Sequence, residues 1–126
     1  MSVDIVIEVE NKPGALAALA AAVEDAGVNL AAATYTGGGE KAELHILVPH
    51  AEPVRHALAI THGAIVSREQ EVVVVEFEDS PGALADLTRK IASAGVNIDT
   101  IYVATNNRVV FGSADIEGLK RALGKA

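Results

Sequence analysis

Two loops and two asparagines are the residues of this chain best suited to hold a small polar molecule. Each loop is a polar residue followed two positions later by Pro-Gly; Asn11–Gly14 reads NKPG and Asp79–Gly82 reads DSPG. An asparagine follows each loop at the same distance, Asn29 in one case and Asn97 in the other. A helix N-terminus offers unpaired N–H groups to a carboxylate, and an asparagine amide can bind either end of a zwitterion. The pattern therefore indicates binding of a small zwitterion.

The loops belong to a longer stretch that the sequence uses twice. Residues 11–30 read NKPGALAALAAAVEDAGVNL and residues 79–98 read DSPGALADLTRKIASAGVNI, with identity at ten of twenty positions. In both copies Pro-Gly is expected to open a helix and Ala-Gly to close it. A unit of this size cannot bury its apolar face alone. The duplication therefore predicts two small domains packed together, residues 1–68 and 71–126.

The first copy has the order of elements of a ferredoxin-like unit. Helical spacing predicts one buried face on its first helix, made of Leu16, Leu19, Ala20, Val23 and Ala26. The expected elements are a strand at Val3–Glu10, a helix opened by Pro13 in its first turn and ended by Gly27, strands at Val28–Thr36 and Ala42–Val48 joined by a glycine hairpin, a helix at Glu52–Ile60, and a strand at Ala64–Val66. This βαββαβ order predicts an α+β fold, an antiparallel sheet with both helices on one face.

The second copy repeats this order without the last strand. The expected elements are a strand at Val72–Phe77, a helix at Gly82–Ala94, strands at Val96–Ala104 and Arg108–Phe111, and a helix at Asp115–Leu123. The result is a truncated βαββα unit that leaves an edge of its first strand open. Because open Val-rich edges invite pairing, we expect another chain, or the segment Ile65–Arg68, to cover it.

Composition excludes several classes of function. The net charge is −7 and no more than two basic residues are adjacent, so a nucleic-acid partner is not expected. No apolar run reaches membrane-spanning length, and the start of the chain lacks a secretory signal pattern. The absence of cysteine excludes thiol chemistry and fits a cytoplasmic protein.

No catalytic, metal or cofactor site is predicted. No nucleophile has a plausible base near it, and the arginines fall in different kinds of element. The histidines are scattered over a strand, a loop, a helix and a helix end: His45, His50, His56 and His62. None forms a pair with metal-ligand spacing, so the chain is expected to be neither an enzyme nor a metalloprotein.

The repeated pattern resembles the ACT domain, a regulatory module attached to enzymes of amino-acid metabolism. Its signature, [N/D]-x-P-G-x-L at a helix start and A-G-V-N-[I/L] before the next strand, occurs twice, at Asn11–Leu16 with Ala26–Leu30 and at Asp79–Leu84 with Ala94–Ile98. The resemblance covers essentially the whole chain. It implies side-by-side pairing of two modules, a free amino acid bound between them, and no catalysis.

The resemblance also implies which residues hold the ligand. The first copy is similar to the regulatory domain of phosphoglycerate dehydrogenase, in which serine lies between the loop of one module and the asparagine of the opposite one. The residues carried over are Asn11, Pro13, Gly14, Ala15, Leu16, Asn29 and Leu30 in the first copy, and Asp79, Ser80, Pro81, Gly82, Ala83, Leu84, Asn97 and Ile98 in the second. Val9 and Phe77 stand where that enzyme has histidine, so the ligand is not identified as serine.

The sequence leaves more than one function open. The first is a non-enzymatic amino-acid sensor, a homodimer that acts through a partner enzyme or through its own assembly. The second is a structural subunit of such an enzyme that binds no ligand, and the third a small ferredoxin-like enzyme. The two loops differ in charge, because Asp79 can pair ionically with an ammonium and Asn11 cannot, so two sites would differ in affinity.

Overall fold

The computed structural model describes residues 2–61 and 63–125. Met1, His62 and Ala126, which the predicted domains include, therefore lie outside the described residues. The described chain divides into two compact units. The N-terminal unit is formed by Val3–Gln70, and the C-terminal unit by Ser2 together with the residues from Glu71 to Lys125.

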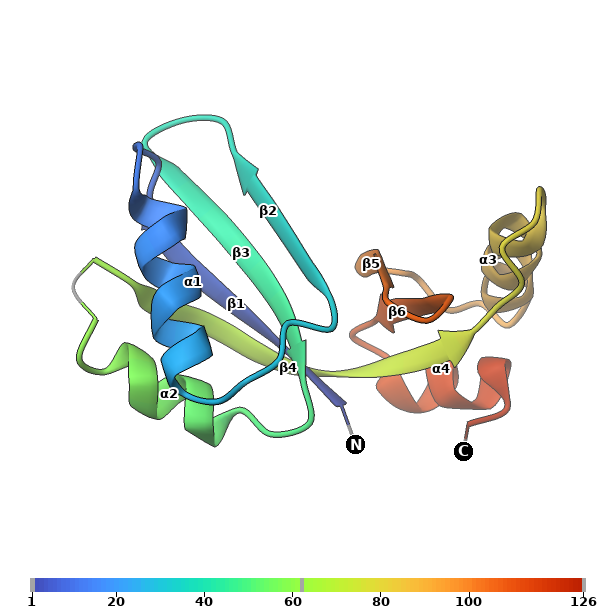
Figure 1. Cartoon of the computed structure of the whole chain (residues 1–126). Coiled ribbons are helices and arrows are strands. Elements are labelled where there is room, and N and C mark those ends of the chain that lie inside the picture. Colours follow the sequence, from blue (N-terminus) through green and yellow to red (C-terminus); the bar gives the residue numbers. More distant parts are fainter. Residues whose placement is uncertain (1, 62, 126) are drawn as a thin grey trace. The chain divides into compact units, whose positions relative to one another are not determined.

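The N-terminal unit is a sheet with two helices on one face (Figure 1). Its elements are β1 (Ser2–Glu10), α1 (Ala15–Asp25), β2 (Ala33–Gly37), β3 (Lys41–Val48), α2 (Glu52–Leu58) and the first part of β4 (Ile65–Glu76). The strand order is β2-β3-β1-β4, and β3 pairs antiparallel with both β1 and β2. The predicted glycine hairpin is present, with Gly37 opposite Ala42.

Alternation along β1 determines which side of this sheet forms the main core. Ile5, Ile7 and Val9 are buried in one cluster with Leu19 and Val23 of α1. The cluster is completed by Ala42, Leu44, Ile46, Val48, Ala51, Val54 and Leu58. Full burial of each Val, Leu or Ile contributes about 1.5–3 kcal/mol, so this layer holds the helices on the sheet.

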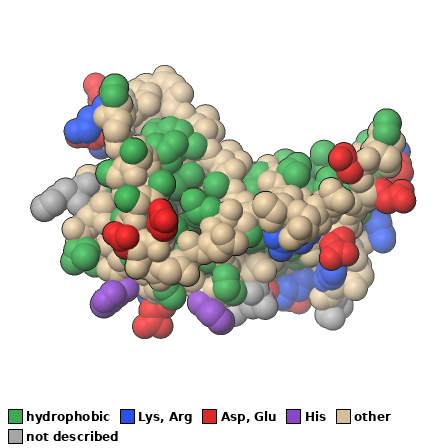
Figure 2. Space-filling view, in the orientation of Figure 1, with side chains coloured by type: hydrophobic (Ala, Val, Ile, Leu, Met, Phe, Trp, Pro, Cys, Tyr) green, Lys and Arg blue, Asp and Glu red, His purple; other side chains and the backbone are tan. Residues whose placement is uncertain are grey.

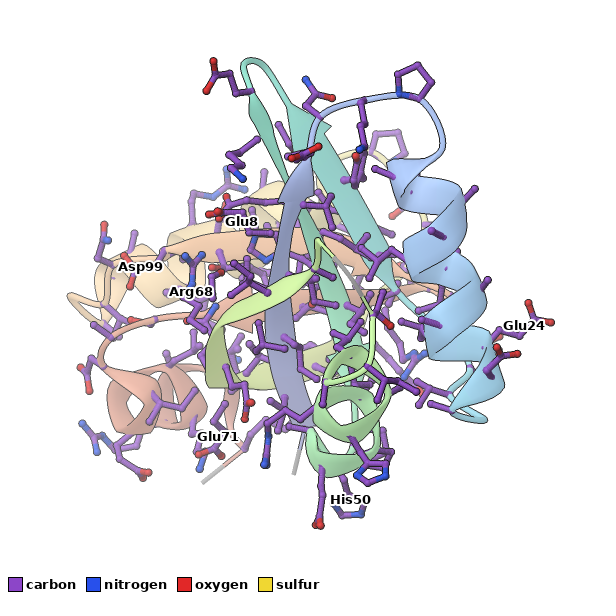
Figure 3. The ribbon with its side chains drawn as sticks, turned by 90° about the vertical axis from the view of Figure 1, so that its left-hand side faces the viewer. Glu8, Glu24, His50, Arg68, Glu71 and Asp99 are labelled. Carbon is purple, nitrogen blue, oxygen red and sulfur yellow. The ribbon has the colours of Figure 1, made fainter. Side chains whose placement is uncertain are left out.

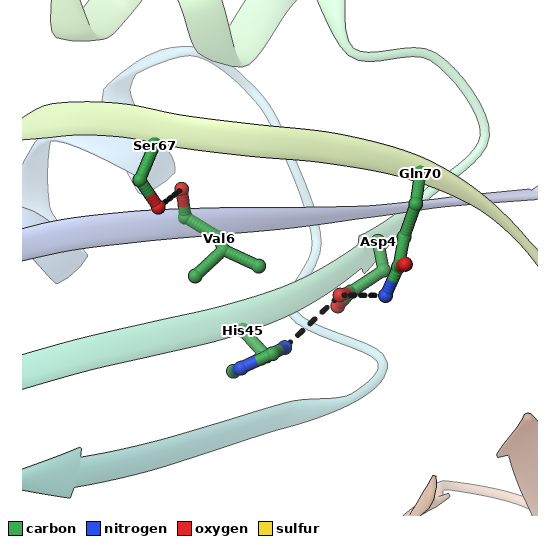
Figure 4. Close-up of polar contacts among 5 residues, drawn as sticks. All are labelled: Asp4, Val6, His45, Ser67 and Gln70. Carbon is green, nitrogen blue, oxygen red and sulfur yellow. Dashed lines mark hydrogen bonds and ion pairs between the residues drawn. The ribbon is translucent and has the colours of Figure 1, made fainter. Parts of the chain in front are cut away.

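A polar network lies on the other face of β1 (Figure 4). Asp4 is completely buried, and its Oδ2 is 3.0 Å from His45 Nδ1 on β3. Gln70 Nε2 on β4 donates to the same oxygen at 3.2 Å, and Ser67 Oγ donates to the Val6 carbonyl at 3.2 Å. A buried carboxylate without such partners costs several kcal/mol, so the network links β1, β3 and β4 in one register.

The C-terminal unit consists of the second part of β4, α3 (Ala83–Ser93), β5 (Thr100–Ala104), β6 (Arg108–Gly112) and α4 (Ile116–Leu123). Its strand order is β4-β6-β5, all antiparallel. Asn106 and Asn107, both with positive φ, form the predicted tight turn between β5 and β6. Its core is a separate cluster that contains Val73, Val96, Val109, Phe111, Ile91, Leu119 and Leu123.

The structure corrects the prediction for the segment that joins the two units. Ala64–Val66 and Val72–Phe77 were expected to be separate strands, but one 12-residue strand, β4, runs from Ile65 to Glu76. Ser67–Glu71 contains neither Gly nor Pro and continues the extended conformation. The prediction that Ile65–Arg68 covers the edge of Val72–Phe77 was therefore wrong, because one continuous strand cannot pair with itself side by side. Pairing of that edge by another chain stays a prediction.

The boundaries of α1 also differ from those expected. Pro13 precedes the helix instead of lying in its first turn, because Gly14 is the N-cap residue and its φ of 87° is left-handed. Leu16 is 39% exposed although its spacing predicted burial. At 100° per residue the buried arc is centred on Leu19 and continues to Ala15 and Ala22, so Leu16 lies at its border.

The strands that follow the two long helices are shorter than predicted. β2 begins at Ala33 rather than at Val28, and β5 at Thr100 rather than at Val96. The Val-Asn segments at their starts are loops. Their apolar residues nevertheless pack inward: Val28 borders the N-terminal core and Val96 is buried in the C-terminal one. Val28 and Val96 had thus been assigned to strands because they are apolar, although they pack into the cores from loops.

No helix in the described part of the chain is long and apolar enough to cross a membrane.

Candidate functional site

The two Pro-Gly loops have the same geometry. Gly14 and Gly82 are the N-cap residues of α1 and α3, with φ of 87° and 88°, and no side chain caps either helix. The Ala15 amide donates to the Lys12 carbonyl at 3.2 Å, and the first intrahelical bond runs from the Ala18 amide to Gly14 at 3.0 Å. The amides between these two have no carbonyl partner in an α-helix. Both loops therefore present backbone donors at the positive end of a helix dipole.

A cavity of about 400 Å³ lies beside the first loop. Its lining comes from the end of β1, the loop, α1 and the segment after α2: Val9, Glu10, Lys12, Pro13, Gly14, Ala15, Ala18, Leu19, Thr61, Gly63 and Ala64. The volume is within the range of small-ligand sites. Three predicted ligand residues, Pro13, Gly14 and Ala15, are thus brought to one cavity, whereas Asn11 and Leu16 are not among its lining.

Charges of both signs lie at this cavity. Lys12 Nζ is 3.0 Å from Glu10 Oε2, and the hydrogen bond from Lys12 holds the pKa of the Glu10 carboxyl below its usual value. Both side chains are mostly exposed, so their ion pair is weak and a charged ligand can replace it. An ammonium and a carboxylate at one cavity match the two ends of a zwitterion. Sequence reasoning missed both residues, because Lys12 is a variable position of the loop pattern and Glu10 precedes it.

Asn11 is hydrogen-bonded to the glycine hairpin and does not line the cavity. Its Nδ2 donates to the Gly39 carbonyl at 2.9 Å, and its backbone amide donates to Glu40 at 2.8 Å. Its Oδ1 lies so close to Gly37 that a Cβ there would be 2.9 Å away. Asp79 takes the equivalent place in the C-terminal unit; it is exposed, and among the described residues its carboxylate has no hydrogen bond or ion pair.

The two candidate asparagines differ in the same way. Asn97 Nδ2 donates to Asp99 Oδ1 at 3.0 Å, and Asp99 Oδ2 accepts from the Ala114 amide at 2.8 Å. In the first copy the position of Asp99 is held by Ala31. The exposed Asn29 side chain consequently has no hydrogen bond to any other described residue. Asn97 is therefore held within its own unit, and Asn29 remains available.

Within a unit, the two halves of the motif lie at opposite ends of a helix. α1 has 11 residues and is therefore about 16 Å long, with its loop before it and Asn29 after it. In the C-terminal unit Asn97 and Ile98 border a separate cavity of about 410 Å³ near the end of α3. Leu84 and Ile98 also pack against the core of that unit, while Leu30 is 39% exposed. A small molecule cannot contact both halves of one copy.

Comparison with known proteins identifies the family to which this fold belongs. A family model described as an ACT domain pair matches residues 1–117. The chain belongs to the ACT domain family. Its two copies of the motif are the two members of the ACT pair. No curated protein is significantly similar to the chain.

Solved structures share the architecture of this ACT pair. Protein BT0572 from Bacteroides thetaiotaomicron is 24% identical, with a TM-score of 0.83 over 98% of this chain and 86% of that one. The ligand-free regulatory subunit of aspartate kinase from Thermus thermophilus is 19% identical, with a TM-score of 0.71 over 99% and 91%. The same subunit from Thermus flavus is 20% identical, with a TM-score of 0.61 over 98% and 91%. At these identities the likeness shows a common fold.

Proposed function

We propose that this ACT pair is a non-enzymatic cytoplasmic sensor that binds a free amino acid and transmits its binding to a partner enzyme or to its own assembly. The observation that carries the proposal is the first Pro-Gly loop. There, uncapped helix amides, Lys12 and Glu10 surround a cavity of about 400 Å³. The amides and Lys12 would take the carboxylate, and Glu10 the ammonium. The aspartate kinase subunits of the same fold, named as regulatory, are compatible with this role.

The side chains without partners determine which residues should matter most. Asn29 and Asp79 are available, whereas Asn11 and Asn97 already bind the hairpin and Asp99. The two halves of one copy lie at opposite ends of a helix about 16 Å long, so one small ligand cannot contact both. We propose that Asn29 and Asp79 each contribute more to amino-acid binding than Asn11 and Asn97.

The test is amino-acid binding, measured by calorimetry, in Asn29→Ala, Asp79→Ala and Asn97→Ala. Removing a hydrogen-bond partner of a charged ligand group costs about 1–3 kcal/mol, or roughly 5- to 150-fold in affinity, and we expect this for Asn29 and Asp79. Asn97→Ala is the matched control and should weaken binding less, since its amide is held by Asp99. Equal losses of affinity in Asn29→Ala and Asn97→Ala would contradict the ranking of the two asparagines. Unchanged binding in all three variants would show that none of these side chains contacts the ligand.

One observation favours a second candidate, an interaction subunit without ligand. Ile101 and Val103 on the edge strand β5 are 42% and 59% exposed. They pair with Phe111 and Val109, so they lie on the same face of the sheet as the buried core. Apolar side chains at an edge strand favour association, including a homodimer. A Val103→Lys variant that lowers the molar mass in solution without changing amino-acid binding would support assembly through this edge.

A further inference from the structure

A second concave site lies between α1 and α2, and its lining includes no residue of the Pro-Gly loop. It is a groove of about 810 Å³ within the N-terminal unit. Its apolar part is formed by Ala22 and Ala26 of α1 and Ala57 of α2, with Ile60, which is 86% exposed, at the border. Figure 2 shows hydrophobic side chains over these helices, with acidic and histidine side chains beside them. Volume and apolar lining are those of a small-molecule site.

The groove is negatively charged. Asp25 and Glu52 line it, and neither carboxylate has an ion-pair partner among the described residues. The lining contains no Lys or Arg, and its other ionisable residues are His50 and His56. The one arginine of α2, Arg55, is bonded to Glu69 on β4, its Nε 2.8 Å from Oε2. Arg55 is therefore paired with Glu69 rather than with the carboxylates of the groove, and Asp25 and Glu52 would attract a cation.

The end of α1 strengthens this preference. Its last turn contains Glu24 and Asp25 and no basic residue. The C-terminus of a helix carries the negative end of the dipole, where acidic side chains are unfavourable and cations favourable. A bound cation would relieve this unfavourable arrangement.

We propose that the groove between α1 and α2 binds an organic cation with an apolar body, such as an arylalkyl amine. The ammonium would lie between Asp25 and Glu52, and the apolar body on Ala22, Ala26 and Ala57. A free amino acid would fit this site less well, because its carboxylate would be repelled by the two acidic residues. The site is thus additional to the amino-acid function proposed above and does not depend on it.

Three probes of nearly the same shape test the requirement for positive charge. 2-Phenylethylamine, 2-phenylethanol and phenylacetate are titrated into the ¹⁵N-labelled chain, and the amide signals of Ala22, Ala26 and Ala57 are followed. The amine should bind about tenfold more tightly than the alcohol, since two exposed ion pairs together contribute about 1–2 kcal/mol. Phenylacetate should bind most weakly. Equal affinities for the three probes would overturn the proposal.

Surface variants test the two carboxylates. Asp25→Asn and Glu52→Gln should each weaken amine binding about three- to fivefold and leave alcohol binding unchanged. Glu24→Gln is the matched control, because Glu24 is in the same turn but does not line the groove and points outward from α1 (Figure 3). An equal loss in the control would overturn the assignment. So would shifts of the same signals with protein concentration alone, since the groove would then be a contact between copies.

Discussion

The left-handed conformation of Gly14 gives a prediction that separates backbone strain from steric fit. At a φ of 87°, an L-residue is disfavoured by about 1–2 kcal/mol relative to glycine. A Cβ at this position would meet no atom within 4 Å, so space does not require glycine here. Gly14→Ala should therefore destabilise the chain through conformation alone.

Gly38 provides a matched control in the exposed hairpin. It too has open space for a Cβ, and its φ is not left-handed. Both substitutions reduce the entropy of the unfolded chain by a similar amount, about 0.4–1 kcal/mol, which cancels in the comparison. Gly14→Ala should thus be less stable than Gly38→Ala by about 1–2 kcal/mol. Asparagine tolerates this conformation better than other residues, so Gly14→Asn should recover part of the loss.

Urea unfolding followed by circular dichroism measures these differences. A loss of 1 kcal/mol should also lower the melting temperature by roughly 3–6 °C in a chain of this length. Equal stability of Gly14→Ala and Gly38→Ala would refute the reasoning, because both positions have space for a Cβ and only Gly14 has a left-handed φ. Gly82→Ala should repeat the result in the C-terminal unit, since its φ is 88°.

Three further predictions concern stability. Asp4→Ala should cost about 1–3 kcal/mol in urea unfolding, because it removes a completely buried oxygen bonded to both His45 and Gln70, whereas Asp86→Ala at an exposed pair should cost less than about 0.5 kcal/mol. Asn107→Val should cost about 1–2 kcal/mol at its positive φ, and Asn107→Gly nothing. The hydrogen bond to Glu71 raises the pKa of Lys120. The contribution of this pair to the free energy of unfolding is therefore present at neutral pH and lost as the pH rises beyond 10.5. In Glu71→Gln, the melting temperature should depend less on pH across that range.

Local patterns in the sequence were sufficient to predict the helices, hairpins and ferredoxin-like units. Pro-Gly, Ala-Gly and the glycine hairpin act through their own backbone conformations, which neighbours hardly change. The single strand β4 was missed because its polar middle, Ser67–Gln70, gives no apolar alternation. Gln70 and Ser67 are instead bonded to Asp4 and the Val6 carbonyl of β1. These hydrogen bonds join residues more than 60 positions apart, so a local sequence pattern cannot predict them.

The candidate site shows the same limit. The motif predicted a ligand role for both loops and both asparagines, and the charge of Asp79 distinguished the loops, but nothing in the motif distinguished Asn29 from Asn97. The difference between them comes from Asp99, a residue outside the motif that binds Asn97 and has Ala31 as its counterpart. Likewise, Lys12 and Glu10 share the lining of a cavity with Thr61 and Ala64, which lie about 50 positions away in the sequence. The sequence predicted where a ligand loop lies, and tertiary contacts decide which side chains remain available.

The most direct test of the central claim is a thermal-shift screen of the purified chain against all twenty amino acids at millimolar concentration. A ligand of the folded state at a hundredfold excess over its Kd stabilises it by about 2.7 kcal/mol. We predict that one amino acid, or one chemical group of them, raises the melting temperature by several degrees. A flat response to all twenty from a well-folded chain would contradict the sensor function and favour the interaction subunit.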